Sequence, residues 1–278
     1  MSDADPWSFL KAHTAARIAQ GRTGHSLPTS ALLSFQLDHA RARDAVHSNL
    51  DTAILNQLNA VHPGTLLLHS QAADRQTYLQ RPDLGRKLSL SSGENLQGLR
   101  AGAPVRPGLQ DPTGLAGFNL CIVIADGLSA TAVNGHAVPI VAGLVAAVRA
   151  QNWSVAPVCV VEQGRVAIGD EIAHELRAEL LVVLIGERPG LSSPDSLGAY
   201  LTYQPKPGLT DESRNCVSNI RPEGLSYAFA IQKIGYLLAE MKRRRLSGVM
   251  LKDDMPATHT LGRTSSPVAT GQIPGTPD

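Results

Sequence analysis

The chain has 278 residues, a formal net charge of +1, 43% hydrophobic residues and only 4% aromatic ones. The near-neutral charge gives no electrostatic basis for binding nucleic acid or an anionic membrane. The length suits either one large α/β domain or a domain with an extension, and the hydrophobic content is ample for a core.

The sequence predicts a protein of the cytoplasm. No apolar run approaches the ~20 residues that cross a bilayer, and residues 1–20 lack the apolar core of a secretory signal. The three cysteines cannot all pair within the chain, and no CxxC motif occurs. Reduced thiols are therefore expected.

Residues 1–63 are predicted to form an N-terminal helical extension. A short helix is expected over 6–21 and a longer one over about 30–48, after a loop rich in glycine and polar residues. Asp51 can cap a third helix, which ends at the Pro-Gly pair 63–64.

The helix expected over 30–48 has two different sides. Leu33, Leu37 and Ala40 recur at helical spacing, so we expect this side to be buried. Residues 38–44 are rich in acidic and basic side chains, which face either solvent or a protein partner. A solvated face is the simpler interpretation of such a charge pattern.

From residue 64 the sequence predicts alternating strands and helices. Residues 75–100 predict a polar insertion with short helices, a proline-rich linker follows at 103–112, and the last helix is expected over about 224–246. Apolar runs predict strands at 65–70, 118–125, 155–161 and 180–185, with a possible edge strand at 199–203.

This alternation favours the α/β class, with a mostly parallel sheet covered by helices on both faces. The domain is expected to span residues 64–252. Residues 253–278 are rich in Pro, Thr, Ser and Gly, and they predict a disordered tail.

Polar residues follow three of the predicted strands, at the edge where open α/β sheets bind ligands. Residues 126–129 can either hold an anion or cap the next helix. Arg165 and Val166 offer a donor and an apolar contact to a flat cofactor, or form an ordinary surface turn. Glu187 and Arg188 can hydrogen-bond ligand amides, or form a solvated ion pair.

Residues 187–224 are dense in Gly, Pro, Ser and Asn, and they predict a long irregular segment of the kind that usually carries function. Cys216 lies in this segment, beside Asn215, whereas Cys121 and Cys159 fit the core. With no adjacent histidine, Cys216 is better explained as a liner of a polar site than as a nucleophile.

Common catalytic and nucleotide-binding motifs are missing from the sequence. The nine histidines form no HExxH or H-x-x-x-H pair, so no metal site is expected. The absence of GxGxxG and GxxxxGK[ST] disfavours nicotinamide-cofactor and nucleoside-triphosphatase functions.

The chain resembles the small subunits of ethanolamine ammonia-lyase over roughly residues 10–252. Five segments carry the resemblance: GRTGHSLPTSALLSFQLDHARARDAVH (21–47), YLQRPDLGRKL (78–88), IVIADGLSATAV (122–133), VEQGRVAIGDEI (161–172) and the block from LIGERPG to IRPEGL (184–225). The last block is long and unusual in composition, so chance agreement is an inadequate explanation.

The resemblance implies a Rossmann-like α/β domain with an N-terminal helical extension, in a hetero-oligomer with a large TIM-barrel subunit. That complex converts ethanolamine to acetaldehyde and ammonia with adenosylcobalamin, and the small subunit is inactive alone. Because the D-x-H-x-x-G motif is absent, the cobalamin should keep its own base on the metal. The catalytic residues are expected in the large subunit.

Carried onto this sequence, the resemblance implies cobalamin contacts at Val166, Glu187 and Cys216, with Arg165, Arg188 and Asn215 as neighbours. It leaves open whether the protein is free in the cytoplasm or enclosed in a bacterial microcompartment.

Two other functions remain as alternatives. The chain could be a non-catalytic scaffold that assembles or solubilises the large subunit. It could also be a free-standing α/β enzyme that uses Asp126, Ser129 or Cys216.

Overall fold

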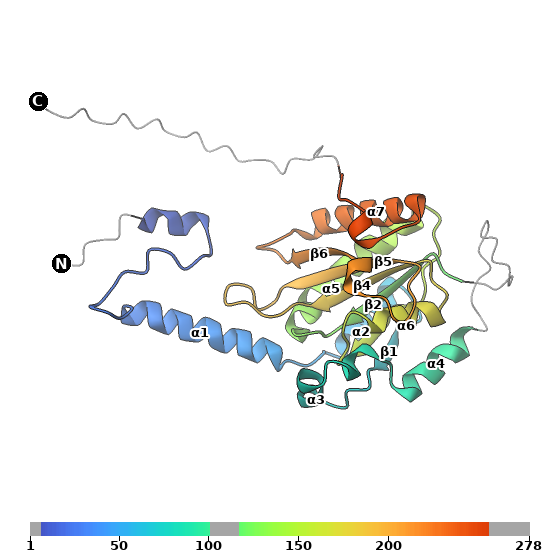
Figure 1. The fold of residues 1–278 in the computed structure, drawn as a ribbon, viewed down its shortest axis with the longest axis horizontal. Helices are drawn as coiled ribbons and strands as arrows, with labels where there is room; N and C mark the ends of the chain where they lie inside the picture. Colours follow the sequence, from blue (N-terminus) through green and yellow to red (C-terminus); the bar gives the residue numbers. More distant parts are fainter. Residues whose placement is uncertain (1–6, 101–116, 256–278) are drawn as a thin grey trace, which may run out of the picture.

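The computed structural model describes residues 7–100 and 117–255 (Figure 1). The linker predicted at 103–112 and residues 256–278 of the predicted tail lie outside these ranges. The described residues form one mixed sheet flanked by helices, and an N-terminal arm projects from it (Figure 1).

The sheet has the strand order β1-β3-β2-β4-β5-β6. The four strands β1, β3, β2 and β4 are parallel, while β5 is antiparallel to both of its neighbours. The predicted α/β class is confirmed, with two antiparallel pairs in a sheet predicted to be mostly parallel. The strands are β1 (Leu66–His69), β2 (Leu120–Ala125), β3 (Cys159–Glu162), β4 (Leu180–Gly186), β5 (Leu197–Tyr203) and β6 (Asn215–Ile220).

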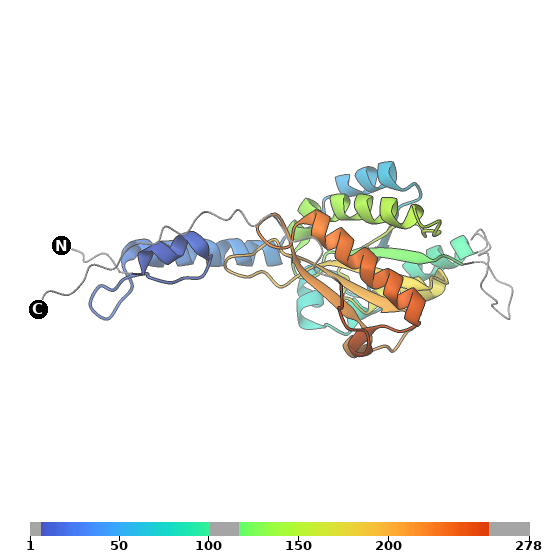
Figure 2. The same cartoon turned by 90° about the horizontal axis from the view of Figure 1, so that it is seen from above.

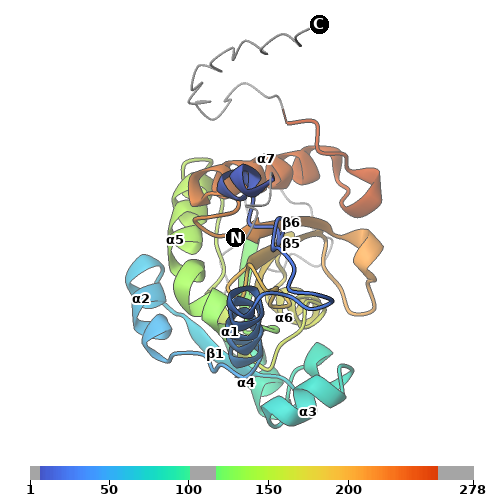
Figure 3. The same ribbon diagram turned by 90° about the vertical axis from the view of Figure 1, so that its left-hand side faces the viewer.

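Helices cover both faces of the sheet, as predicted (Figures 2 and 3). On one face α2, α5 and α7 enclose one hydrophobic cluster, and on the other face α4 and α6 enclose a second. The α-helices are α1 (Thr29–Val46), α2 (Ala53–Val61), α3 (Arg75–Gln80), α4 (Leu90–Arg100), α5 (Ala130–Arg149), α6 (Ile168–Glu175) and α7 (Tyr227–Arg244). Short 3-10 helices are η1 (Ser8–His13), η2 (Leu84–Arg86), η3 (Asp211–Ser213) and η4 (Gly248–Met250).

The two central strands, β2 and β4, are buried along their whole length. Their near-continuous apolar sequences are typical of strands that are covered on both faces. Helix α5 packs on them, and it is also long and apolar enough to cross a membrane by length and composition alone. Half of that helix is buried inside the fold, as in the core helix of a soluble domain.

Three strand predictions need correction. β5 is not an edge strand, because β6 pairs with its outer side. β6 itself lies inside the segment predicted to be irregular, where only Val217 and Ile220 are buried, so its apolar signal is weak. β3 begins at Cys159 rather than 155, and Pro157 just before it cannot donate to a sheet ladder.

Two helix predictions also need correction. The helix expected over 6–21 is only the 3-10 helix η1. The apolar side of α1 is not buried, because Leu33 and Leu37 are 58% and 52% exposed and Ala45 is the buried residue of that helix. A helical pattern shows which residues share a face, but it does not show whether the same chain covers that face.

Candidate functional site

The carboxyl ends of β2 and β4 meet in a tight backbone contact. Gly127 follows β2 with a φ of 59°, and the next amide, of Leu128, donates to the Gly186 carbonyl at 2.9 Å. A Cβ atom at Gly186 would lie 2.6 Å from the Asp126 carbonyl oxygen and closer still to that of Ser129. Both positions therefore require glycine, and β4 is held against the start of α5.

The turn at 126–129 is occupied by the protein's own hydrogen bonds. The Asp126 carboxylate accepts from the amides of Gln163 at 2.9 Å and Gly164 at 3.0 Å. Burial raises the pKa of Asp126 to about 6, although these amides lower it in part. The Ser129 hydroxyl accepts from the Ala132 amide at 3.3 Å, which confirms the helix-cap interpretation of this turn.

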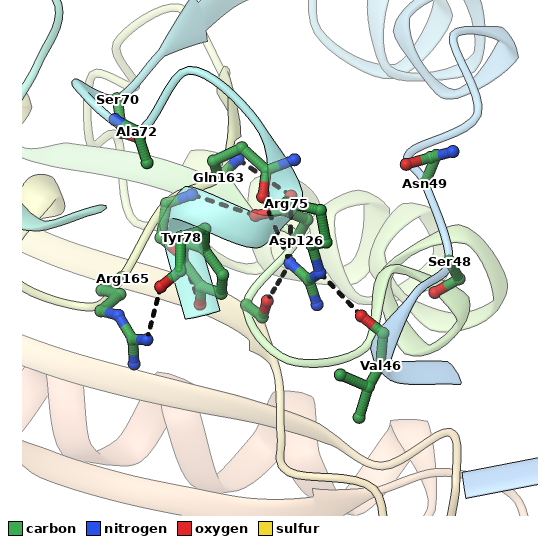
Figure 4. A network of polar contacts seen from close by, with 12 residues as sticks. Val46, Ser48, Asn49, Ser70, Ala72, Arg75, Tyr78, Asp126, Gln163 and Arg165 are labelled. Carbon is green, nitrogen blue, oxygen red and sulfur yellow. Dashed lines mark hydrogen bonds and ion pairs between the residues drawn. The ribbon is translucent and has the colours of Figure 1, made fainter. Parts of the chain in front are cut away.

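Arg75, from α3, joins this turn to the N-terminal arm (Figure 4). Its NH1 donates to the Gly127 carbonyl at 2.8 Å and lies 3.7 Å from the Asp126 carboxylate. Its Nε donates to the Val46 carbonyl, the last residue of α1, at 2.7 Å. One guanidinium therefore fixes the base of the arm to the carboxyl edge of the sheet.

Arg165 and Val166 lie in the turn after β3, and the 75–88 insertion holds this turn in place. The Arg165 amide donates to the Gly85 carbonyl at 2.8 Å, and its NH2 donates to the Tyr78 carbonyl at 3.0 Å. The guanidinium also stacks over the Tyr78 ring, while its Nε has no hydrogen-bond partner among the described residues. Val166 is half-buried against the α6-side cluster.

Glu187 directly follows β4 and points along the sheet toward β5 and β6. The Ser196 hydroxyl donates to its carboxylate, and the Asn219 amide donates to the same group at 3.3 Å. A Cβ at Gly198 would lie 2.8 Å from Oε1 of Glu187, so glycine leaves room for this carboxylate on β5. Arg188, the next residue, is exposed.

Cys216 on β6 lies opposite Tyr200 on β5, and it is exposed. Desolvation raises the pKa of the thiol, the interaction with Tyr200 lowers it in part, and the nearby charge of Glu187 raises it further. Desolvation, together with Cys216 and Glu187, raises the pKa of Tyr200 to about 12. A neutral thiol is a poor nucleophile, so this geometry disfavours a catalytic role for Cys216.

The Asn215 side chain, unlike that of Cys216, is used in hydrogen bonds within the fold. Its side-chain amide donates to the carbonyls of Gly248 and Leu251, and its oxygen accepts from the Gly248 amide at 2.7 Å. These bonds tie the chain after α7 to β6. The structure therefore brings Glu187 and Cys216 together around Tyr200 and places Val166 and Tyr200 beside the same hydrophobic cluster, but it uses the Asn215 side chain elsewhere.

A buried ion pair joins the start of β6 to helix α6, which covers one face of the sheet. Arg214, just before β6, makes two hydrogen bonds to the Asp170 carboxylate of α6, at 2.7 and 2.6 Å. Both side chains are 1% exposed. The position of β6 beside β5 thus depends on a guanidinium that water does not reach.

Sequence reasoning missed the supporting residues of this region, namely Arg75, Tyr78, Ser196 and Tyr200. The only available signal was the 78–88 segment, which carries the family resemblance but has no motif that indicates a function for Tyr78. An α/β pattern also cannot show that an insertion folds back onto the edge of the sheet.

Comparisons with known proteins agree with the resemblance seen in the sequence. The family model "Ethanolamine ammonia-lyase light chain" matches residues 4–252. Among curated relatives, the ethanolamine ammonia-lyase small subunit of Ralstonia nicotianae is 56% identical over 250 residues, covering 90% of this chain and 88% of that protein. Those of Pseudomonas fluorescens and Xanthomonas campestris are 57% and 55% identical over 251 residues, with the same coverage of both chains.

Proposed function

The chain belongs to the ethanolamine ammonia-lyase light-chain family as a small subunit of that lyase, and from this premise we propose that it binds adenosylcobalamin where it meets a large catalytic subunit. The complex would be a hetero-oligomer in which the large subunit is a TIM barrel. The observation that carries the cofactor proposal is the convergence of Glu187 and Cys216 on Tyr200, on the α6 side of β5 and β6.

The residues at this edge fit a corrin. Such a ring is broad and amphipathic with amides at its rim, so it needs an apolar contact and hydrogen-bonding partners around it. Val166 offers the apolar contact, and the half-buried Arg165 beside it offers a guanidinium. Glu187 offers a carboxylate that accepts hydrogen bonds. The Cys216 side chain is small and exposed, so it leaves the surface of β6 accessible to a ligand.

When bound, adenosylcobalamin supplies radicals by homolysis of its cobalt–carbon bond, which supports conversion of ethanolamine to acetaldehyde and ammonia. The residues of this chain would bind the cofactor and orient it. Glu187 is held by Ser196 and Asn219, so its carboxylate is positioned before a ligand arrives. No D-x-H-x-x-G motif supplies a histidine to the metal, and we expect the cofactor to keep its own base.

We expect Glu187→Ala to weaken adenosylcobalamin binding by roughly 10- to 100-fold, since a hydrogen bond to a charged group contributes about 1.5–3 kcal/mol. The dissociation constant is measured by absorbance titration of the assembled complex. Glu212→Ala is the matched control, because Glu212 is an exposed carboxylate bonded only to Thr210 among the described residues.

An unchanged dissociation constant for Glu187→Ala, in a complex that assembles normally, would favour the alternative in which this chain is a non-catalytic scaffold. Sedimentation of the variant complex and thermal unfolding of the variant chain show whether assembly and folding are intact.

A further inference from the structure

The N-terminal arm, residues 7–46, exposes an unusual amount of apolar surface. Of the eleven large hydrophobic side chains that are exposed in the described ranges, seven lie in this arm. Isolated exposed apolar residues are ordinary, but a contiguous set marks an interaction site. The seven are Trp7, Phe9, Leu27, Leu32, Leu33, Phe35 and Leu37.

The exposed residues of α1 lie on more than one side of the helix. At 100° per residue, Leu33 and Leu37 share one side, and Leu32 and Phe35 share another. In Figures 1 and 2 the helix extends away from the sheet, and its N-terminal part lies far from the sheet and the helices that cover it. Most of the stability of a helix in a protein comes from packing one of its faces against a neighbour, and Ala45 is the buried residue of α1. The arm therefore has the form of an element that inserts into a partner.

The base of the arm is fixed. Besides the bond from Arg75 to the Val46 carbonyl, the Thr131 amide donates to the Ser48 hydroxyl at 3.0 Å. Asn134 of α5 accepts from the Asp51 amide and donates to the Asn49 carbonyl, both at 3.0 Å. These contacts position the arm before it binds, which reduces the entropy lost on association.

The charged side chains of α1 are all paired within the arm. Asp38 pairs with Arg17 at 2.6 Å and with Arg41 at 3.8 Å, and Arg43 lies 3.5 Å from Asp44. The Arg17 guanidinium also lies over the Phe35 ring. What α1 has left for a partner is therefore apolar side chains, which fit an apolar groove better than a charged patch.

We propose that the arm docks, through Leu33 and Leu37, into an apolar groove of the large subunit; this rests on the proposed function. The choice of partner follows from position. Arg75 ties Val46 at the arm's base to Gly127, in the turn after β2, at the carboxyl edge that also holds Glu187. The subunit that covers the cofactor at this edge therefore extends along the arm.

The test is sedimentation velocity of the full chain titrated with its cognate large subunit, first without cobalamin. The double variant Leu33→Glu/Leu37→Glu should bind at least ~30-fold more weakly, because the loss of a hot-spot residue costs about 2 kcal/mol or more. The matched control is Leu90→Glu, because Leu90 is 87% exposed and belongs to α4, which lies on the opposite side of the molecule from the arm (Figure 1). Leu33→Ala/Leu37→Ala, which keeps a strong helix former at both positions, should weaken binding in the same direction.

The outcomes separate this inference from the proposed function. If the unaltered chain does not bind the large subunit, the proposed function fails and the docking proposal falls with it. If the unaltered chain binds and the double variant binds equally well, the arm is not the docking surface, although the proposed function stands. If the unaltered chain forms dimers that the double variant abolishes, while binding to the large subunit is unchanged, the occupant is a second copy and the proposal is overturned.

Discussion

Replacing Gly186 by alanine should destabilise the protein by roughly 3 kcal/mol and weaken adenosylcobalamin binding to the assembled complex. The new methyl group would lie 2.6 Å from the Asp126 carbonyl oxygen and closer still to that of Ser129. Both are backbone atoms, so neither can move without shifting the start of α5 or the end of β4. A shifted β4 end also moves Glu187, which is the next residue.

The free energy of unfolding is measured by urea titration. Gly235→Ala is the matched control, because a Cβ there meets no atom within 4 Å. Inside α7 that substitution should stabilise the protein by about 0.5–1 kcal/mol, since glycine is unfavourable in a helix. Equal stability of Gly186→Ala and the unaltered chain would show that Gly186 is not in tight contact with the 126–129 turn.

Replacing Arg214 by methionine should lower the free energy of unfolding by about 3–5 kcal/mol, because it leaves the buried carboxylate of Asp170 without its partner. The two side chains share a pair of hydrogen bonds at 2.7 and 2.6 Å, and each is 1% exposed. Burial already raises the pKa of Asp170 even with the arginine present, and the variant should raise it further.

Urea titration of this variant at several pH values tests the mechanism. A carboxylate whose pKa is higher in the folded state than in the unfolded state makes folding less favourable as pH rises through that interval. The loss of unfolding free energy caused by Arg214→Met should therefore be smaller at acidic pH. Arg243→Met is the control, because the Arg243 side chain is 65% exposed and Glu240 keeps Arg244 as a second partner, so its loss should cost little. A loss that does not change with pH would argue against an unpaired Asp170 as its cause.

The parts of the fold that the sequence predicts are those with a strong local pattern. β2 and β4 are continuous apolar runs, and both are found where expected within two residues. β6 has only Val217 and Ile220 facing the core, and its other residues are polar, so composition alone favours a loop. Its strand conformation depends on pairing with β5 and on the Arg214–Asp170 ion pair, which are long-range contacts.

The candidate site likewise contains some residues that the sequence predicts and others that it does not. Glu187, Arg165 and Val166 follow strands, and topology alone brings such residues to one edge of a parallel sheet. The identity of the proposed cofactor rests on the family resemblance, because no spacing in the chain specifies a corrin. Arg75 and Tyr78 come from an insertion whose folded position has no periodic signature, and they could not be predicted.

We propose that this chain is a subunit that supplies part of a cobalamin site and has no activity of its own. The most direct test of this proposal is ammonia release from ethanolamine by this chain alone, by the large subunit alone, and by both together, each with adenosylcobalamin. Ammonia release is expected only from the mixture. A stable complex of the two subunits that binds adenosylcobalamin but releases no ammonia, or ammonia release by this chain alone, would contradict it.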